Sequence, residues 1–395
     1  MINQVTGLLD RGADVRIVSM QPVEDTVMHA SVSEYNLAQR TTHLLGQDSL
    51  FGGWQRGMTL RNLAWGAASL RGLRYGYKAM NGWLPAVWSA WRAKCDELRP
   101  DVVVAHFGPI GDAACCLRSL GAFRAPLATV VHGLDMSTPL LAGKRLYPRL
   151  RRQAELMLPI SRRWRDALLD DGYDADRVRV HHVGVDVPPW ATADRPPPRG
   201  EYGREDEPVR FLSVCRLVEK KGLDYALRAL AKAKAGGIGE FRYSIVGDGP
   251  ERPDLESLRN ELNLRGEVEF VGALPREQVT DYLLEHDVFL LPSVTTANGD
   301  QEGIPTSLME AMAYGLVAIA TRHSGTPELV EDGVSGRLAE ERDIDGLCEV
   351  LIEVSRRRGL WSDYRRNGWA KVNQEFNIER LNDRLLTTLT SLATE

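Results

Sequence analysis

Two glutamates, Glu302 and Glu310, stand eight residues apart in the stretch EGIPTSLMEAMAYG (302–315). A continuous helix would place them about 80° apart around its axis and roughly 12 Å apart along it, too far to act on one atom. Gly303 and Pro305 instead predict a loop to about residue 305 and a helix over 306–314. The helix N-terminus then lies between the carboxylates and offers free N–H groups to an anion. This arrangement fits a long ligand with a central diphosphate and hydroxyls at both ends.

Two cations accompany these glutamates. Arg216 and Lys221 lie in SVCRLVEKKGLD (213–224), just past an expected strand. Both can neutralise a leaving diphosphate, as group transfer from a nucleotide requires. Loops after two further strands, VGDGP (246–250) and VGALP (271–275), expose backbone groups for a base. The first of them lacks the third glycine of a dinucleotide-binding motif and is a poor signal for one.

The elements that must position these residues alternate between strand and helix on both sides of a linker, predicted over 187–208. This alternation predicts parallel, doubly wound sheets in two Rossmann-like α/β domains that face a cleft. In the second half we expect strands over 209–217, 242–249, 268–274, 287–293 and 316–322, with helices over 223–235, 253–264, 276–286 and 306–314. In the first half we expect strands over 14–19, 101–108, 126–133, 155–161 and 178–184.

The expected domains are an N-terminal one over 1–186, a C-terminal one over 209–365, and C-terminal helices over 366–395 that pack back on the first. The segment 2–12 already reads as a helix, so the first strand of the N-terminal domain is expected to be missing and the start truncated. Composition is that of a soluble globular protein, with 43% hydrophobic and 26% charged residues. No apolar run is long enough to span a membrane, and the opening residues predict no secretory signal. Five scattered cysteines predict buried thiols and a cytoplasmic location.

Charge is distributed unevenly along the chain. Residues 1–185 carry 23 Lys and Arg against 17 Asp and Glu, whereas 186–395 carry 26 against 37. The segment 49–95 has no acidic residue but seven basic residues and five of the nine tryptophans, and 144–165 has eight basic residues and one acid. This pattern suits peripheral contact with an anionic membrane, with a buried helix pair and solvated arginines as the alternative. Nucleic acid is not expected, because the whole chain is acidic and has no binding motif.

Taken together, Arg216, Lys221, the two glutamates and VHGLD (131–135) resemble retaining glycosyltransferases of family 4, which have the GT-B fold. AHFGPIG (105–111), VVHGLDMS (130–137) and VHHVGVD (180–186) resemble the bacterial exopolysaccharide branch, such as colanic acid and amylovoran biosynthesis transferases. The resemblance implies transfer from a nucleotide sugar to a glycan or an undecaprenyl-diphosphate-linked acceptor. It also implies that Arg216 and Lys221 bind the diphosphate, that Glu310 holds the ribose, and that Glu302 and His132 face the sugar.

The remaining donor contacts are expected from three segments, whose residues are Gly247, Gly272, Ala273, Leu274, Gly303, Ile304, Pro305, Thr306, Ser307 and Leu308. On the acceptor side, weaker candidates are His106, Gly108 and Asp135. Asp174-Ala-Asp176 has the form of a metal-binding DxD but lies before an expected strand, where Asp serves as a cap. No metal or cofactor is therefore expected. Two alternatives stay open: a nucleotide-sugar epimerase or phosphorylase of this fold, and a truncated protein that binds a nucleotide sugar without turnover.

Overall fold

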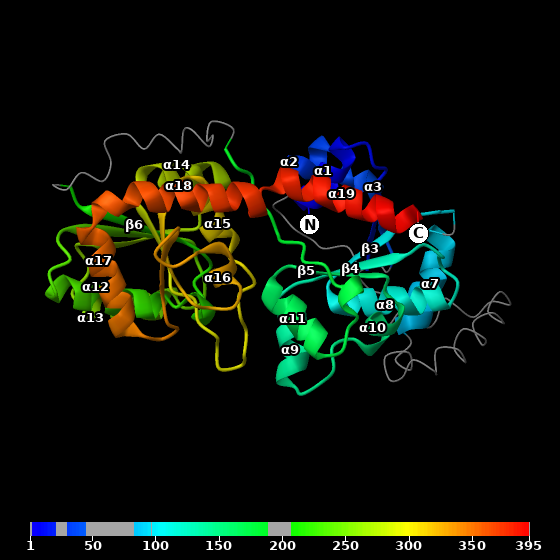
Figure 1. The fold of residues 1–395 in the computed structure, drawn as a ribbon, viewed down its shortest axis with the longest axis horizontal. Helices are drawn as coiled ribbons and strands as arrows, with labels where there is room; N and C mark the ends of the chain where they lie inside the picture. Colours follow the sequence, from blue (N-terminus) through cyan, green and yellow to red (C-terminus); the bar gives the residue numbers. More distant parts are fainter. Residues whose placement is uncertain (1, 21–29, 45–82, 96, 189–206, 395) are drawn as a thin grey trace.

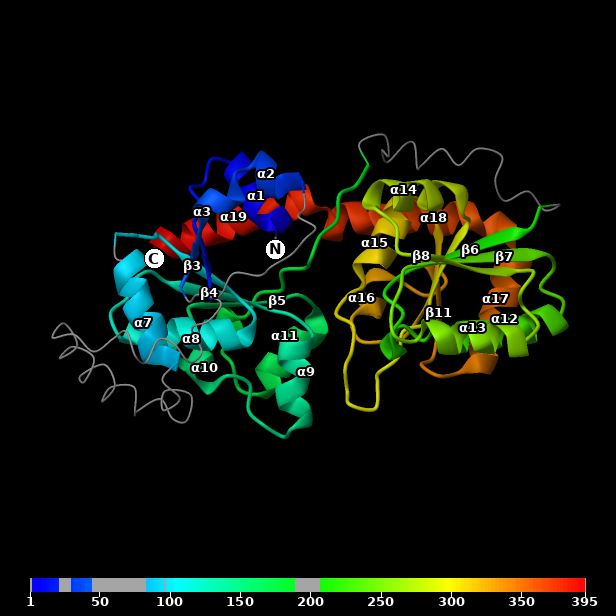
Figure 2. The same cartoon turned by 180° about the vertical axis from the view of Figure 1, so that it is seen from behind.

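The chain forms two α/β lobes joined by crossing segments (Figure 1, Figure 2). The computed structural model describes residues 2–20, 30–44, 83–95, 97–188 and 207–394. The prediction of two Rossmann-like domains is confirmed, because the strands of each lobe pair in parallel and alternate with helices. Most of the expected linker, 189–206, lies outside the described residues.

The C-terminal domain is built on a six-stranded parallel sheet with the order β11-β10-β9-β6-β7-β8. Chain order reverses between β6 and β9, which pair at Phe211↔Val288 and Leu212↔Phe289. Such a reversal opens a crevice at the carboxyl ends of the two strands, where ligands of doubly wound sheets bind. The strands are β6 (Val209–Val214), β7 (Phe241–Val246), β8 (Val268–Gly272), β9 (Val288–Leu291), β10 (Val317–Thr321) and β11 (Gly336–Ala339).

Helices cover both faces of this sheet and bury two apolar clusters against it. The first cluster takes Leu227, Leu230 and other apolar residues from α12 (Leu223–Ala235), α13 (Arg252–Glu261) and α17 (Ile344–Arg356). The second takes residues from α14 (Arg276–Glu285) and α15 (Thr306–Ala313). The short α16 (Thr326–Leu329) follows β10. The helices expected over 223–235 and 306–314 are confirmed to within one residue.

The N-terminal domain contains a parallel sheet β3-β4-β5 and a separate parallel pair β1-β2. The strand expected over 178–184 does not form as a regular strand: Val178 bridges to Met157 of β5, and Arg179 and His181 N–H donate to Met157 O and Pro159 O. The strands are β1 (Ile17–Ser19), β2 (Thr41–His43), β3 (Val103–His106), β4 (Leu127–Val131) and β5 (Leu156–Pro159). The helices are α1 (Ile2–Asp10), α2 (Ala30–Glu34), α3 (Leu37–Arg40), α7 (Trp83–Lys94), α8 (Gly108–Ser119), α9 (Leu134–Leu141), α10 (Pro148–Gln153) and α11 (Arg162–Asp170).

The end of the chain returns to the N-terminal domain. Helix α18 (Trp361–Lys371) lies on the C-terminal domain, a π-helical turn (Val372–Phe376) follows, and α19 (Ile378–Thr394) runs along the other lobe (Figure 1). Leu385 and Leu389 of α19 join the core of the N-terminal domain. At the crossing, Val185 N–H donates to Phe376 O and Val185 O accepts from Ile378 N–H, so the two segments between the lobes are paired.

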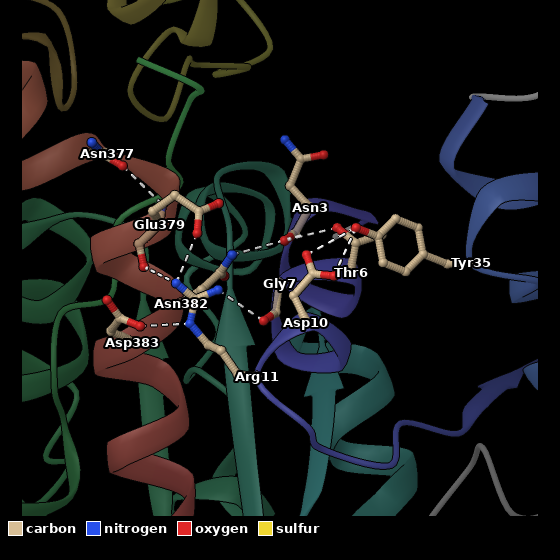
Figure 3. Close-up of polar contacts among 10 residues, drawn as sticks. All are labelled: Asn3, Thr6, Gly7, Asp10, Arg11, Tyr35, Asn377, Glu379, Asn382 and Asp383. Carbon is tan, nitrogen blue, oxygen red and sulfur yellow. Dashed lines mark hydrogen bonds and ion pairs between the residues drawn. The ribbon is translucent and has the colours of Figure 1, made fainter. Parts of the chain in front are cut away.

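Ion pairs and hydrogen bonds hold α19 against α1 (Figure 3). Arg11 pairs with Asp383 at 2.7 Å and with Glu379 at 3.0 Å. Asn382 is buried and donates to Asn3 O at 3.1 Å. Gly7 faces Asn382 so closely that a Cβ would lie 1.8 Å from its amide nitrogen. The first and last helices therefore fit together only because residue 7 has no side chain.

Candidate active site

The loop after β6 is tied to the loop after β9, across the reversal of strand order. Gly222 has a φ of 63°, and a Cβ there would lie 2.0 Å from Pro292 O. Val294 N–H donates to Lys220 O at 2.9 Å. The glycine between the lysines and α12 thus permits the close approach that sets Lys221 beside the β9–α15 loop.

Lys221 and Glu302 meet at this reversal of strand order. Lys221 Nζ lies 3.0 Å from Glu302 Oε1, and the side chains are only 13% and 11% exposed. Lys220 pairs with Asp300 at 3.2 Å and lies 3.9 Å from Glu302. Arg216 is exposed and makes no ion pair with any residue that the structure describes. The predicted diphosphate group Lys221 and the predicted sugar group Glu302 are therefore in contact, whereas Arg216 forms no ion pair within the described part of the chain.

Glu302 and Glu310 are separated as the sequence predicts, one in the loop and one in α15, which begins after Pro305. The first backbone amides of a helix have no partner within it, so the start of α15 offers N–H groups to an anion. Leu308 and Ile304 are buried, so only their backbone can serve a ligand. Glu310 lies 3.9 Å from Arg276, and burial raises its pKa above the ordinary value.

The two loops predicted to bind the base, 246–250 and 271–275, are joined by a backbone hydrogen bond. Gly247 N–H donates to Gly272 O at 2.8 Å, so this amide is occupied within the protein. A Cβ on Gly247 would lie 1.8 Å from Cys215 O, which gives this glycine a packing role. Ala273 is exposed and Leu274 packs against the core before α14 begins.

His132 lies at the end of β4 in the N-terminal domain. The Asp135 carboxylate accepts from His132 N–H and from Gly108 N–H, both at 2.9 Å. His106 Nδ1 lies 3.4 Å from His132 Nε2, and burial lowers the pKa of each histidine to about 4. Both imidazoles are therefore neutral at pH 7. A Cβ on Gly108 would lie 2.1 Å from the Tyr147 ring, so a larger residue does not fit there.

The two halves of the predicted site meet across the domain boundary. A Cβ on Gly133 would lie 3.6 Å from Gln301 O and 3.7 Å from Gly303 N, which places the His132 turn against the Glu302 loop. A Cβ on Gly303 would lie 2.7 Å from the Ile160 side chain. Arg163 donates to Gln301 Oε1 at 3.0 Å. Residues far apart in the sequence are thus neighbours in one site.

A second set of hydrogen bonds between the domains is formed by Glu328. The Glu328 carboxylate accepts from Arg162 N–H at 2.8 Å and from Arg163 N–H at 3.1 Å, at the start of α11. His182 Nε2 lies 3.2 Å from the same carboxylate. Burial opposes ionisation, but these hydrogen bonds hold the pKa of Glu328 below its ordinary value. The carboxylate is therefore a stable acceptor for the helix N-terminus.

Asp174 has the capping role that the sequence predicts. Its carboxylate accepts from Asp176 N–H at 3.1 Å at the start of a 3-10 turn, Ala175–Arg177. Among the described residues, no group of three or more His, Cys, Asp and Glu side chains is placed to hold a metal ion. None of the described helices is long and apolar enough to cross a membrane.

The basic, tryptophan-rich segments are only partly described. Arg56, Arg61, Arg71, Arg74 and Lys78 lie outside the described residues. Within α7, Trp91 is buried and Trp88 packs against the same core, with ring nitrogens bonded to Ala122 O and Leu120 O. Counting these two tryptophans as membrane anchors is wrong, because they belong to the core of the N-terminal domain.

Four residues of the site escaped the sequence reasoning: Lys220, Phe107, His323 and Glu341. Phe107 has a φ of 71°, is 46% exposed, and its ring centroid lies 4.4 Å from that of His132. His323 accepts a hydrogen bond from Glu302 N–H and contacts Glu341. His323 and Phe107 each follow the carboxyl end of a parallel strand, where doubly wound sheets bind ligands, and that position is a sequence signal for both.

Comparison with known proteins identifies the class. The model of the glycosyl transferase 4-like domain matches residues 3–184, and that of glycosyl transferases group 1 matches residues 194–370. The chain belongs to the family 4 glycosyltransferases with the GT-B fold. Its enzyme class, a hexosyltransferase-type glycosyltransferase, follows from this membership.

Individual relatives extend over nearly the whole chain. WcaL of Escherichia coli, a candidate colanic acid biosynthesis glycosyltransferase, is 37% identical over 99% of this chain and 96% of its own length. The amylovoran biosynthesis glycosyltransferase AmsK of Erwinia amylovora is 37% identical over 95% of this chain and 92% of its own.

Solved structures show the same fold at lower identity. Sucrose-phosphate synthase of Thermosynechococcus elongatus has a TM-score of 0.68 at 20% identity, over 99% of this chain and 91% of its own. Anabaena HepE, solved in complex with UDP, has a TM-score of 0.65 at 22% identity, over 77% of this chain and 82% of its own.

Proposed function

We propose that the chain transfers a sugar from a nucleotide-sugar donor to a glycan or lipid-diphosphate-linked acceptor in exopolysaccharide assembly, with retention of anomeric configuration. One observation carries this proposal: the His132 turn packs against the Glu302 loop beside Lys221, so groups from both domains lie close together. The names of WcaL and AmsK support the exopolysaccharide context.

The donor lies along the C-terminal domain in this proposal. Arg216, Lys221 and the first amides of α15 neutralise the diphosphate, and Glu310 holds the ribose. The structurally similar HepE was solved in complex with UDP, and this supports a nucleoside diphosphate as the ligand. Glu302 and His132 contact the transferred sugar, Glu302 from the donor side and His132 from the acceptor side.

Transfer proceeds on one face of the sugar. The bond between the anomeric carbon and the phosphate oxygen breaks, and the acceptor oxygen forms its bond to the same face. The departing phosphate oxygen takes the acceptor proton, so no covalent nucleophile is needed. Arg216, Lys221 and the α15 N-terminus stabilise the negative charge that develops on the phosphate. Because these groups supply the positive charge, we propose that no divalent metal is required.

The acceptor side lies in the basic N-terminal domain. An acceptor on a lipid diphosphate would lie at an anionic membrane surface, which attracts each nearby Lys or Arg by about 1 kcal/mol. Peripheral contact is therefore proposed for the segment around Arg71, Arg74 and Lys78. Reversing these three charges should weaken binding to anionic vesicles and leave nucleotide binding unchanged. Wild-type protein that ignores anionic vesicles at low salt would favour a soluble glycan acceptor.

A nucleotide-sugar panel tests the proposed function. Thermal shifts with UDP, GDP and ADP sugars should identify one donor, and its turnover with a lipid-linked or glycan acceptor should release the nucleoside diphosphate. NMR of the product should show the donor's anomeric configuration. An epimerised donor without released diphosphate would support the epimerase alternative, and binding without any turnover would support a protein that only binds the donor.

A further inference from the structure

A fully enclosed histidine holds the backbone of Glu302. The His323 side chain is 0% exposed, and its Nε2 accepts from Glu302 N–H at 3.0 Å. Its Nδ1 lies 2.7 Å from Glu341 Oε1. A backbone amide can only donate, so Nε2 must carry a lone pair and Nδ1 must carry the proton. The contacts therefore select the neutral imidazole that donates from Nδ1 to Glu341.

Glu341 also holds the other end of the same loop. Its second carboxylate oxygen accepts from Thr295 N–H at 2.7 Å, and the neighbouring Arg342 guanidinium donates to Thr295 O. The loop between β9 and α15 is thus fixed at Thr295, just after β9, and at Glu302, just before the α15 N-terminus. Its two anchors converge on one carboxylate.

Backbone strain accompanies both anchors. Ser324, directly after His323, has a φ of 47°, and Arg342, directly after Glu341, has a φ of 64°. Residues with a Cβ adopt this left-handed conformation only where the surroundings hold them in it, and such residues concentrate at functional sites. The strain is therefore an independent sign that the positions of His323 and Glu341 matter.

We propose that His323 is a positioning residue for sugar transfer: its neutral form holds Glu302 beside Lys221, and its protonation releases the Glu302 loop. This inference rests on the proposed function, in which Glu302 contacts the sugar. A protonated imidazole would direct an Nε2–H at Glu302 N–H, and two donors cannot bond. His323 contacts no substrate, so its effect passes through Glu302.

The charges around the ring set the pH at which release occurs. Glu341, Glu302 and Arg163 are the charged groups that act on His323. Burial lowers the pKa of His323, Arg163 acts in the same direction, and the two glutamates oppose them. The net shift is downward, so the neutral form persists at more acid pH than for an ordinary histidine.

Two substitutions separate positioning from packing. His323→Phe fills the space but cannot accept from Glu302 N–H, whereas the carbonyl of His323→Gln can reach that amide and does not titrate. We expect His323→Phe to lower kcat about 10- to 100-fold without weakening the binding of the nucleoside diphosphate, because Arg216 and Lys221 are untouched and Lys221 loses its competing partner Glu302. His323→Gln should keep kcat within about 3-fold and flatten the acid side of the pH profile. Equal losses in both variants, or wild-type kcat in His323→Phe, would overturn the inference.

Imidazole ¹⁵N NMR tests the same inference without turnover. The His323 resonances are those missing from His323→Gln or, if that variant does not fold, those shifted in Glu341→Gln. We expect a neutral ring protonated at Nδ1 at pH 6. A proton on Nε2, or half-protonation near the ordinary histidine pKa, would overturn the inference. A wild-type protein that consumes no nucleotide sugar would instead refute the proposed function and leave the NMR result to decide the role of His323.

Discussion

Replacing Glu302 by Gln should strengthen nucleotide binding while it weakens catalysis. In the free protein Lys221 Nζ lies 3.0 Å from Glu302 Oε1, with both side chains nearly buried. At an effective dielectric constant of about 20, two unit charges at this distance attract by about 5.5 kcal/mol. Desolvation offsets most of this attraction, so the net competition that a diphosphate meets is about 1–2 kcal/mol. Glu302→Gln should therefore bind the nucleoside diphosphate about 5- to 30-fold more tightly.

The rate should move in the opposite direction. If Glu302 contacts the sugar more strongly as the glycosidic bond breaks, the neutral amide loses about 2–3 kcal/mol of transition-state stabilisation. Turnover should then fall roughly 100-fold. General damage to the fold is not expected to tighten nucleotide binding while it slows turnover.

Isothermal titration calorimetry with UDP, GDP or ADP, as selected by the donor panel, measures the affinity. Asp300→Asn is the matched control, because Asp300 pairs with Lys220 at 3.2 Å and lies in the same loop. It should change nucleotide affinity by less than about 3-fold. If Glu302→Gln binds the diphosphate no better than wild type, Lys221 does not face the phosphate and the reasoning fails.

Three further predictions concern metal, pH and packing. Turnover should survive EDTA because cationic side chains serve the diphosphate; activity that requires Mg²⁺ or Mn²⁺ would refute this. His181, like His106 and His132, has a pKa lowered by burial to about 4, so its contribution to stability is complete above about pH 6.5 and is lost as pH falls toward 4. In urea unfolding, the free energy of unfolding of His181→Gln should accordingly fall by about 1–2 kcal/mol less than that of wild type between pH 7 and 5. Equal decreases in the two proteins would contradict the lowered pKa of His181. Gly7→Ala should cost about 1–3 kcal/mol in the same assay because it meets Asn382, whereas Gly359→Ala, with open space around it, should be near neutral; equal effects would contradict the packing account.

The sequence predicted the fold well where elements alternate regularly. The pattern over 223–235 has the helical period between two apolar strands, and α12 has those bounds. Residues 178–184 are equally strand-like in sequence, yet they form no regular strand. Arg179 and His181 N–H still donate to Met157 O and Pro159 O of β5, and the chain then crosses toward the other domain, where Val185 pairs with the segment around Asn377. Composition carries no signal for that departure, because it depends on where the second domain lies.

The site was predictable residue by residue but not as a set of contacts. Lys221 and Glu302 follow the ends of β6 and β9, and only the order of the strands makes those ends neighbours. The contact between His323 and Glu341 spans two loops and depends on the pairing of β10 with β11. Local sequence patterns could not predict the contact of Gly133 with the Glu302 loop either, because it also depends on how distant parts of the chain are arranged.

The most direct test of the central claim is nucleoside diphosphate release from the selected nucleotide sugar by wild type, Arg216→Ala and Lys221→Ala, with a glycan or lipid-linked acceptor present. Each substitution removes a cation whose contact strengthens as the phosphate departs, at a cost of roughly 2–4 kcal/mol. We predict that wild type releases the diphosphate and forms a product with the anomeric configuration of the donor. Each variant should release the diphosphate about 30- to 1000-fold more slowly. Unchanged release by both variants would contradict the assignment of Arg216 and Lys221 to the donor site.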